Sequence, residues 1–310
     1  MPATIACLVV LLVPQEALAQ QDPSFSHYWA MESSFCPAAV GKQELLNVTA
    51  AYNMALAGFE HNPKTMYIAA DMPFALFGTK HGAGLELLND QIGLFRHQRL
   101  SLQYAFKQPL FGGVLSVGVR GGLMSENFDG SDLVINDPGD LTLSSSQIQG
   151  TGFDLGAGLY YQWRGWYLGA SAQHLTAPTI LLGETNEINI ARSYYVTAGG
   201  NIRLRNPLLS VQPSLLARTD GVGWRTDATC RLTYRYDGKM FYGGLGYSPT
   251  NSVTLYLGAL FHGVVFGYSY EAYTHSVGLG SGSHELIVGY QTAIQIGKKG
   301  HNRHQSPRIL

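Results

Sequence analysis

The segment from residue 224 to 236 most restricts how this chain can fold. In an extended strand, successive side chains point to opposite faces. One face here then carries Trp224, Ala228, Cys230, Leu232, Tyr234 and Tyr236, and the other carries charged and hydroxyl side chains. A long strand with one charged face and one apolar face ending in aromatic residues is typical of a membrane barrel with lipid outside and a wet interior. A soluble β-sandwich is the alternative reading.

The same alternation recurs along the chain and predicts fourteen strands. They cover residues 45–56, 64–74, 81–90, 98–107, 112–124, 152–163, 166–174, 192–203, 208–218, 224–236, 239–248, 252–261, 263–271 and 284–294. Short connections such as 164–165 and 237–238 alternate with long ones such as 125–150 and 175–191. Outer-membrane barrels show this alternation. The sequence therefore predicts an all-β, antiparallel transmembrane barrel of about 14 strands with both termini in the periplasm.

The regions outside the strands indicate an exported protein. An apolar run at 5–13 precedes Ala17-Leu18-Ala19, which predicts a signal peptide over 1–19. No other stretch approaches the roughly 18 apolar residues that a membrane-spanning helix needs. The predicted organisation is 1–19 signal peptide, 20–44 periplasmic N-terminal segment, 45–296 barrel and 297–310 basic periplasmic tail. A net charge of -1 gives no indication of nucleic-acid binding.

Charged residues on the inward faces of the strands predict a network in the barrel interior. Such charges need partners or water. The predicted network comprises Asp154, Arg203, Arg218, Arg225, Asp227, Arg231, Arg235 and Glu285. A conduction path through the lumen is the alternative role for these charges.

No motif predicts catalysis, a cofactor or a bound metal. Ser283, His284 and Glu285 have the residue types of a hydrolase triad. Consecutive residues of a strand face opposite sides, so they cannot form the relay. The protein is therefore expected not to be an enzyme.

Ordered blocks near both ends of the chain resemble a known family. Residues 21–28 read Gln-Asp-Pro-Ser-Phe-Ser-His-Tyr, and 35–41 read Phe-Cys-Pro-Ala-Ala-Val-Gly. Closing blocks lie at 266–270, 282–286 and 306–310. Together they resemble the PorP/SprF family of type IX secretion system membrane proteins. The departures are His27 for the usual Gln, Cys36 for Asn and Val40 for Tyr, which leave open the branch of the family.

The resemblance implies an integral outer-membrane protein of a Gram-negative, Bacteroidetes-like cell that exports proteins carrying a C-terminal sorting domain. The partners it implies are the periplasmic ring lipoprotein and its ring partner, a peptidoglycan-binding periplasmic protein, outer-membrane lipid and the secreted proteins themselves. The first function expected is to anchor or couple the ring complex to the outer membrane. A barrel dedicated to one surface adhesin and a channel for hydrophobic small molecules are the alternatives.

The two ends of the chain carry the predicted partner contacts. The aromatic residues of the N-terminal segment would be awkward in free periplasm, so this segment is expected to plug the barrel, strap onto its turns or dock on a partner. The basic tail is expected to contact acidic ring proteins or lipid head groups, unless it is simply solvated. The predicted partner-binding residues are Gln21, Asp22, Pro23, Phe25, Tyr28, Pro37, Gly41, Lys298, Lys299, Arg303, Ser306, Pro307 and Arg308.

Overall fold

The computed structural model describes residues 22–130, 147–183, 186–249, 251–274 and 282–294. Fourteen strands form the barrel wall: β1 (Leu45–Met54), β2 (Lys64–Leu76), β3 (Thr79–Ile92), β4 (Phe95–Leu110), β5 (Gly113–Asp129), β6 (Gln147–Trp163), β7 (Trp166–Gln173), β10 (Ser193–Gly200), β12 (Leu209–Thr219), β13 (Trp224–Tyr236), β14 (Lys239–Ser248), β15 (Ser252–Phe261), β16 (Val264–Tyr273) and β17 (Ser283–Ala293). The remaining elements are β8 (Thr179–Leu182), β9 (Asn186–Asn189), β11 (Ile202–Arg203) and the 3-10 turns η2 (Tyr28–Ala30), η3 (Glu32–Ser34) and η4 (Pro37–Ala39).

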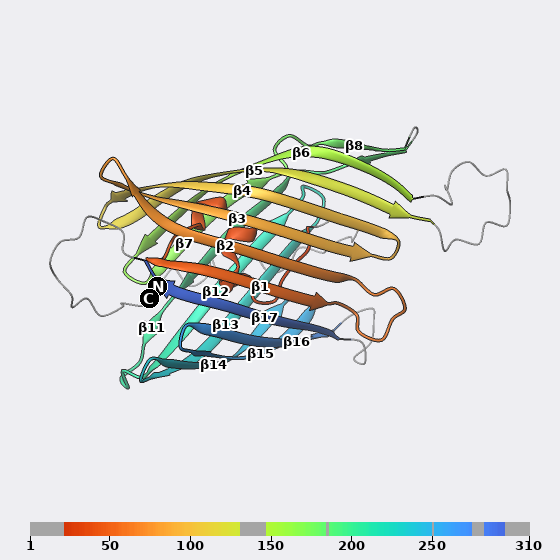
Figure 1. Cartoon of the computed structure of the whole chain (residues 1–310). Coiled ribbons are helices and arrows are strands. Elements are labelled where there is room, and N and C mark those ends of the chain that lie inside the picture. The colour runs from red at the N-terminus through yellow and green to blue at the C-terminus, as the bar shows by residue number, and fades with distance from the viewer. Residues whose placement is uncertain (1–21, 131–146, 184–185, 250, 275–281, 295–310) are drawn as a thin grey trace, which may run out of the picture.

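The wall is closed and antiparallel throughout (Figure 1). Strands adjacent in the chain pair with each other, and β1 pairs with β17 to close the cylinder. β7 pairs with β10 and β10 with β12, because β8 and β9 form a separate two-stranded sheet and β11 extends only the edge of β12. Closure leaves no unpaired edge in the wall, which a spanning sheet requires in lipid. The prediction of a 14-stranded barrel is confirmed.

Alternation of the side chains sets the two faces of the wall. In β13, Trp224, Leu232 and Tyr236 are exposed on the outside, whereas Thr229 and Arg231 are buried inside. The same pattern runs through β4, where Leu100 and Leu102 face outward and Arg99 faces the interior. The apolar outer face suits hydrocarbon, and the polar face is enclosed.

Five two-residue turns join strands at one end of the barrel, here called the turn end. They are Phe77-Gly78, Phe111-Gly112, Arg164-Gly165, Asp237-Gly238 and His262-Gly263, and both residues of each have positive φ. This is the type I′ geometry that matches the twist of a hairpin. β1 begins and β17 ends at the turn end as well. The assignment of that end to the periplasm stays a prediction.

The opposite end, here called the loop end, is uneven in height. β5 and β6 contain 17 residues each, whereas β7 and β10 contain only 8. The β8–β9 hairpin, which was predicted only as part of a connection, packs over the inner face of β5 and β6. Ile180 of this hairpin is fully buried, and a Cβ atom on Gly152 would lie 3.1 Å from its side chain. The hairpin therefore covers part of the lumen at the loop end.

Within the described residues, none of the helical segments has the length and apolar character needed to cross a membrane.

Candidate functional site

Residues 22–44 are here called the plug, and they lie inside the barrel except for Glu44, which is exposed at the turn end. Figure 1 shows the short helical turns of this segment enclosed by the wall. Most of its side chains are buried: Phe25, His27, Tyr28, Met31, Glu32, Phe35, Cys36, Ala38, Ala39 and Val40. The sequence predicted an N-terminal segment at 20–44 that plugs the barrel, straps onto its turns or docks on a partner. The described part lies in the lumen, because its aromatic and aliphatic side chains pack in two clusters with inward residues of the wall, Tyr195 and Leu216 in one and Tyr67 and Leu88 in the other.

Glu285 of β17 binds the first turn of the plug. Its carboxylate accepts hydrogen bonds from the backbone N–H of Ser26 at 2.7 Å and of His27 at 2.8 Å. The Nδ1 atom of His27 lies 2.7 Å from the same carboxylate. Glu285 is 1% exposed, so these are enclosed, charge-assisted contacts, which are stronger than neutral hydrogen bonds.

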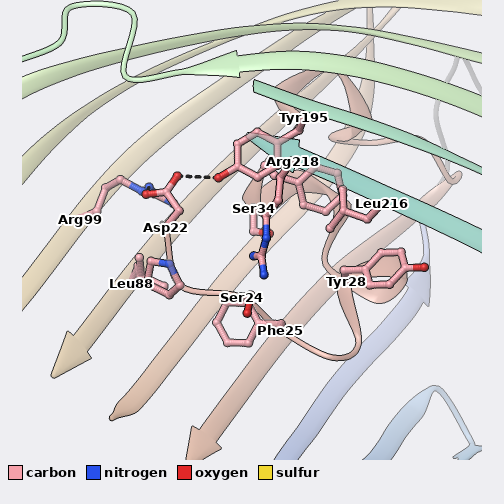
Figure 2. A pocket seen from close by; sticks show the side chains of 12 residues that line it. Asp22, Ser24, Phe25, Tyr28, Ser34, Leu88, Arg99, Tyr195, Leu216 and Arg218 are labelled. Carbon is pink, nitrogen blue, oxygen red and sulfur yellow. Dashed lines mark hydrogen bonds and ion pairs between the residues drawn. The ribbon is translucent and has the colours of Figure 1, made fainter. Parts of the chain in front are cut away.

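Asp22 binds three wall residues at the start of the described chain. Tyr195 donates a hydrogen bond to its carboxylate at 2.7 Å, as Figure 2 shows, and His174 Nε2 lies 2.9 Å away. Arg99 is 3.9 Å distant. Burial raises the pKa of the Asp22 carboxyl, but the charge and hydrogen bond of His174, with the charge of Arg99 and the Tyr195 hydrogen bond, together hold that pKa well below its usual range.

His174 follows β7 directly and links Asp22 to the wall. Its Nδ1 atom lies 3.2 Å from the carboxylate of Asp154. Burial lowers the pKa of His174, but the charge of Asp22 and the hydrogen bonds with Asp154 and Asp22 raise it to about 9. The imidazole is therefore charged at neutral pH, and the contact is an ion pair between plug and wall.

The middle of the plug contacts β4 to β7. Tyr160 donates to Glu32 at 2.6 Å, and Lys42, at the end of the plug, pairs with the same carboxylate at 2.6 Å. Arg120 donates to the carbonyl of Ser34 at 3.2 Å. Ser171 donates to the carbonyl of Phe35 at 2.6 Å. Side chains of the wall thus satisfy backbone groups that the plug's short turns leave unpaired.

Glycines on the inner face allow the plug backbone to approach the wall. A Cβ atom on Gly118 would lie 2.5 Å from the carbonyl carbon of Pro37, and one on Gly82 would lie 2.8 Å from that of Val40. Ordinary van der Waals contact begins at 3.4 Å. The interior of the wall is therefore shaped to fit the plug.

A small cavity lies between plug and wall beside Asp22. The cavity around Asp22, Phe25 and Tyr28 in Figure 2 has a volume of about 30 Å³. A dry cavity that binds benzene measures about 150 Å³. The space shown is therefore large enough for a water molecule and too small for an aromatic ligand.

Six of the eight predicted network residues face the interior. Arg225 bridges Asp227 and Glu271, at 3.0 Å in each case, and Arg218 lies 3.9 Å from Asp227. The guanidinium of Arg231 lies 3.5 Å from the centre of the Trp29 ring. Asp154 and Glu285 bind residues described above. The other two lie towards the turn end, where Arg203 is exposed and Arg235 half-buried.

The prediction missed the larger charge cluster on β3 to β5. Arg99 donates to Glu86 at 2.9 Å, Gln103 donates to the same carboxylate at 2.8 Å, and Arg120 pairs with Asp154 at 3.2 Å. Arg99, Gln103 and Arg120 stand at inward positions of predicted strands, so alternation could have identified them. Glu86 belongs to the predicted strand 81–90, where Leu85, Leu87 and Leu88 fall on both faces and alternation gives no clear answer.

The predicted partner-binding residues of the plug contact the wall. Phe25 packs against Tyr67, with ring centres 5.4 Å apart. Tyr28 Oη lies 3.1 Å from Ser214 Oγ. The N–H of Gly41 donates to Asp71 at 2.7 Å, and Pro37 is buried. Pro23 lines the cavity beside Asp22. Gln21, Lys298, Lys299, Arg303, Ser306, Pro307 and Arg308 lie outside the described residues.

The side chains at 283–285 alternate as expected. Glu285 points inward to the plug, whereas His284 binds Tyr268 at 2.7 Å on the other face. In the described part of the chain, no group of three His, Cys, Asp or Glu side chains could hold a metal ion.

Comparison with known proteins identifies the family. The model of the family described as "Type IX secretion system membrane protein PorP/SprF" matches residues 17–290. The chain belongs to the PorP/SprF family. It is thus a type IX secretion membrane protein, integral to the outer membrane, and its family and fold are those of a secretion-system barrel and not of an enzyme. No curated protein sequence matches this PorP/SprF chain.

Solved structures similar to this PorP/SprF chain are outer-membrane barrels. The "CymD monoaromatic hydrocarbon channel" has 13% identity and a TM-score of 0.50 over 86% of this chain and 93% of that one. A Pseudomonas aeruginosa FadL homologue has 12% identity and a TM-score of 0.44 over 83% and 91%. At these identities the likeness concerns the fold alone.

Proposed function

We propose that this barrel is a closed scaffold of the type IX secretion system. It anchors or couples the periplasmic ring complex to the outer membrane while proteins with C-terminal sorting domains are exported by another route. The contacts proposed are with the ring lipoprotein, its ring partner and a peptidoglycan-binding protein. The basic tail at 297–310 is a proposed part of that contact.

The filled lumen is the observation that supports this role. A conduit needs a path along its axis, but the plug occupies the interior and is held by Glu285, Glu32 and Asp22 at three separate places. Each contact is a hydrogen bond to a carboxylate, and a hydrogen bond to a charged group contributes about 1.5 to 3 kcal/mol. A barrel that is closed in this way can still carry a load between the membrane and a periplasmic complex.

A channel for hydrophobic molecules fits the interior less well. The cavity beside the plug in Figure 2 has a volume of about 30 Å³, and its lining includes the charged groups of Asp22, Arg99 and Arg218. An apolar ligand would leave those charges without water or a partner, which is unfavourable. Transport would therefore require the plug to leave first.

The decisive test is a pull-down in mild detergent from the organism's own membranes, with identification by mass spectrometry. The scaffold predicts recovery of ring proteins with the wild-type barrel. A barrel with Lys298, Lys299, Arg303 and Arg308 neutralised should recover less. Planar-bilayer recordings of the same preparation should show no steady conductance. Absence of every type IX component from the pull-down would refute the scaffold, and recovery of one giant adhesin alone would indicate the adhesin-specific role.

A further inference from the structure

Two neighbouring turns at the turn end present bare phenylalanine rings. Phe77 and Phe111 occupy the first position of type I′ turns, with φ of 51° and 48°. Asn, Asp and Gly favour this position, and a bulky residue there is a conformational outlier. Phe77 is 94% exposed and Phe111 88% exposed. The barrel's own packing therefore gives no reason for aromatic rings at these two sites.

Both turns are braced by side chains. Thr79 Oγ1 donates to the carbonyl of Leu76 at 2.8 Å and lies 2.7 Å from Nε2 of His81. Tyr161 Oη donates to the carbonyl of Leu110 at 3.1 Å. The backbone of each turn is therefore held in place, so little backbone entropy is lost when a partner binds, which favours binding.

The rings stand beyond the aromatic layer of the outer face. That layer is formed by Phe74, His81, Tyr104 and Phe106, whose ring centres lie 5.2 to 5.7 Å from that of His81. Such layers mark the membrane interface in outer-membrane barrels. Phe77 follows Phe74 by three residues and Phe111 follows Phe106 by five, so the tips stand roughly 10 to 16 Å farther along their strands. The rings therefore lie at the extreme end of the barrel, beyond this layer.

The register sets the spacing of the two tips. Lys80 is opposite Lys107, so the β4–β5 turn extends about two residues beyond the β2–β3 turn. The turns are two strand widths apart, which gives a separation of about 12 Å. A single protein partner can contact both.

The rest of the rim is basic. Among the described residues, its exposed charged side chains are Lys80, Arg164, Arg203, Arg205 and Lys239 against Glu44 and Asp237. Lys80 pairs with Glu44 at 2.5 Å, which leaves a positive excess on the side of the rim formed by β6 to β14. Complementary charge increases the rate and specificity of association with an acidic surface.

We propose that the turn end is a docking surface for an acidic protein whose apolar recesses accept Phe77 and Phe111. The aromatic rings are the anchors of this contact and the basic side chains form its rim, as in many protein interfaces. That this partner belongs to the type IX machinery rests on the proposed function. Anionic lipid head groups would also be attracted by the rim, but they offer no shaped recess for two rings.

The test replaces each phenylalanine with the residue that its turn prefers. Phe77→Asn and Phe111→Asn, alone and together in the full-length protein, create Asn-Gly turns, so the barrel should fold and resist heat at least as well as wild type. In parallel, a benzophenone side chain is placed at 77 or 111 in living cells and irradiated. Val222, which is 71% exposed at the loop end, is the control position.

The proposal predicts that positions 77 and 111 cross-link to the same acidic protein and that position 222 does not. Charge reversal of Arg203, Arg205 and Lys239 should reduce the cross-link at least tenfold. The double Asn variant should lose the partner by a similar factor while its heat stability is kept. Adducts only to lipid, or full retention of the partner by the double Asn variant, would overturn the proposal.

The outcomes separate this proposal from the scaffold role. Loss of an acidic partner by the double Asn variant, with no type IX component recovered by the wild-type barrel, would support the docking surface and contradict the scaffold. Recovery of ring proteins together with full retention of the acidic partner by the double Asn variant would support the scaffold and contradict the docking surface.

Discussion

Replacing Gly118 with leucine tests whether the plug is fitted to the wall. The new Cβ would lie 2.5 Å from the carbonyl carbon of Pro37 and closer still to the backbone of Ala38. The deficit is about 1 Å relative to ordinary contact, and it is against backbone, which no change of rotamer can relieve. Overpacking of this kind typically costs about 1 to 3 kcal/mol.

The strain energy determines how often the plug leaves its docked position. The strain is present only while the plug is docked, so it adds directly to the free energy of the closed state. A strain of about 1 to 3 kcal/mol should therefore raise the open population of the plug about 5- to 150-fold, at 1.4 kcal/mol per factor of ten.

The assay is hydrogen–deuterium exchange of the plug amides in lipid nanodiscs. In Gly118→Leu, amides at 36–41 should exchange about 5- to 150-fold faster than in wild type, and bilayer recordings should show brief openings. Gly121→Leu is the matched control, because Gly121 lies on the outer face of the same strand and its Cβ would be 3.8 Å from the nearest atoms. If Gly118→Leu folds and its plug exchanges like wild type, the fit of plug to wall is not what closes the lumen. Gly118→Ala gives a smaller perturbation should the leucine variant fail to fold.

Three further perturbations address single contacts of the plug. Glu285→Gln removes the negative charge to which two plug amides donate, so the first turn of the plug should be destabilised by about 2 to 3 kcal/mol. Hydrogen–deuterium exchange should become faster in that turn and stay unchanged at 36–41. The pKa of His174, raised to about 9, means that its pairing with Asp22 stabilises the plug fully below about pH 6.5 and is lost as pH rises through about 9. His174→Gln should abolish the resulting rise in plug exchange between pH 7 and 10, and a rise that persists would contradict the assignment. Arg231→Met removes the cation that faces Trp29 and should destabilise the docked plug by about 2 kcal/mol. The measurement is the temperature at which the plug becomes protease-sensitive, which should fall; an unchanged temperature would show that the contact contributes little.

The wall of the barrel could be predicted from the sequence because its rule is local. Each strand must show apolar side chains to lipid and polar ones to the interior, so every second residue reports its own environment, as in β13. X-Gly pairs such as Asp237-Gly238 report the turns in the same way. The family blocks at both ends of the chain indicated the secretion system, and the family match confirms it.

The interior could not be predicted because its contacts join residues far apart in the sequence. Leu88 looked anomalous on a strand that already had outward leucines, yet it belongs to the cluster in which Phe25 of the plug is buried. Gly118 is one of many strand glycines until the backbone of Ala38 is seen against it. Alternation predicts that Glu285 faces inward. It does not predict that the backbone N–H groups of Ser26 and His27, 259 and 258 residues away, donate hydrogen bonds to its carboxylate.

The sequence alone therefore determined that the chain is a membrane barrel, which strand is next to which, and to which family it belongs. Only the tertiary structure decided that the N-terminal segment closes that barrel. The physical reason is that lipid imposes a two-residue period on any strand in it, whereas packing between plug and wall follows the three-dimensional shapes of both and leaves no period in either.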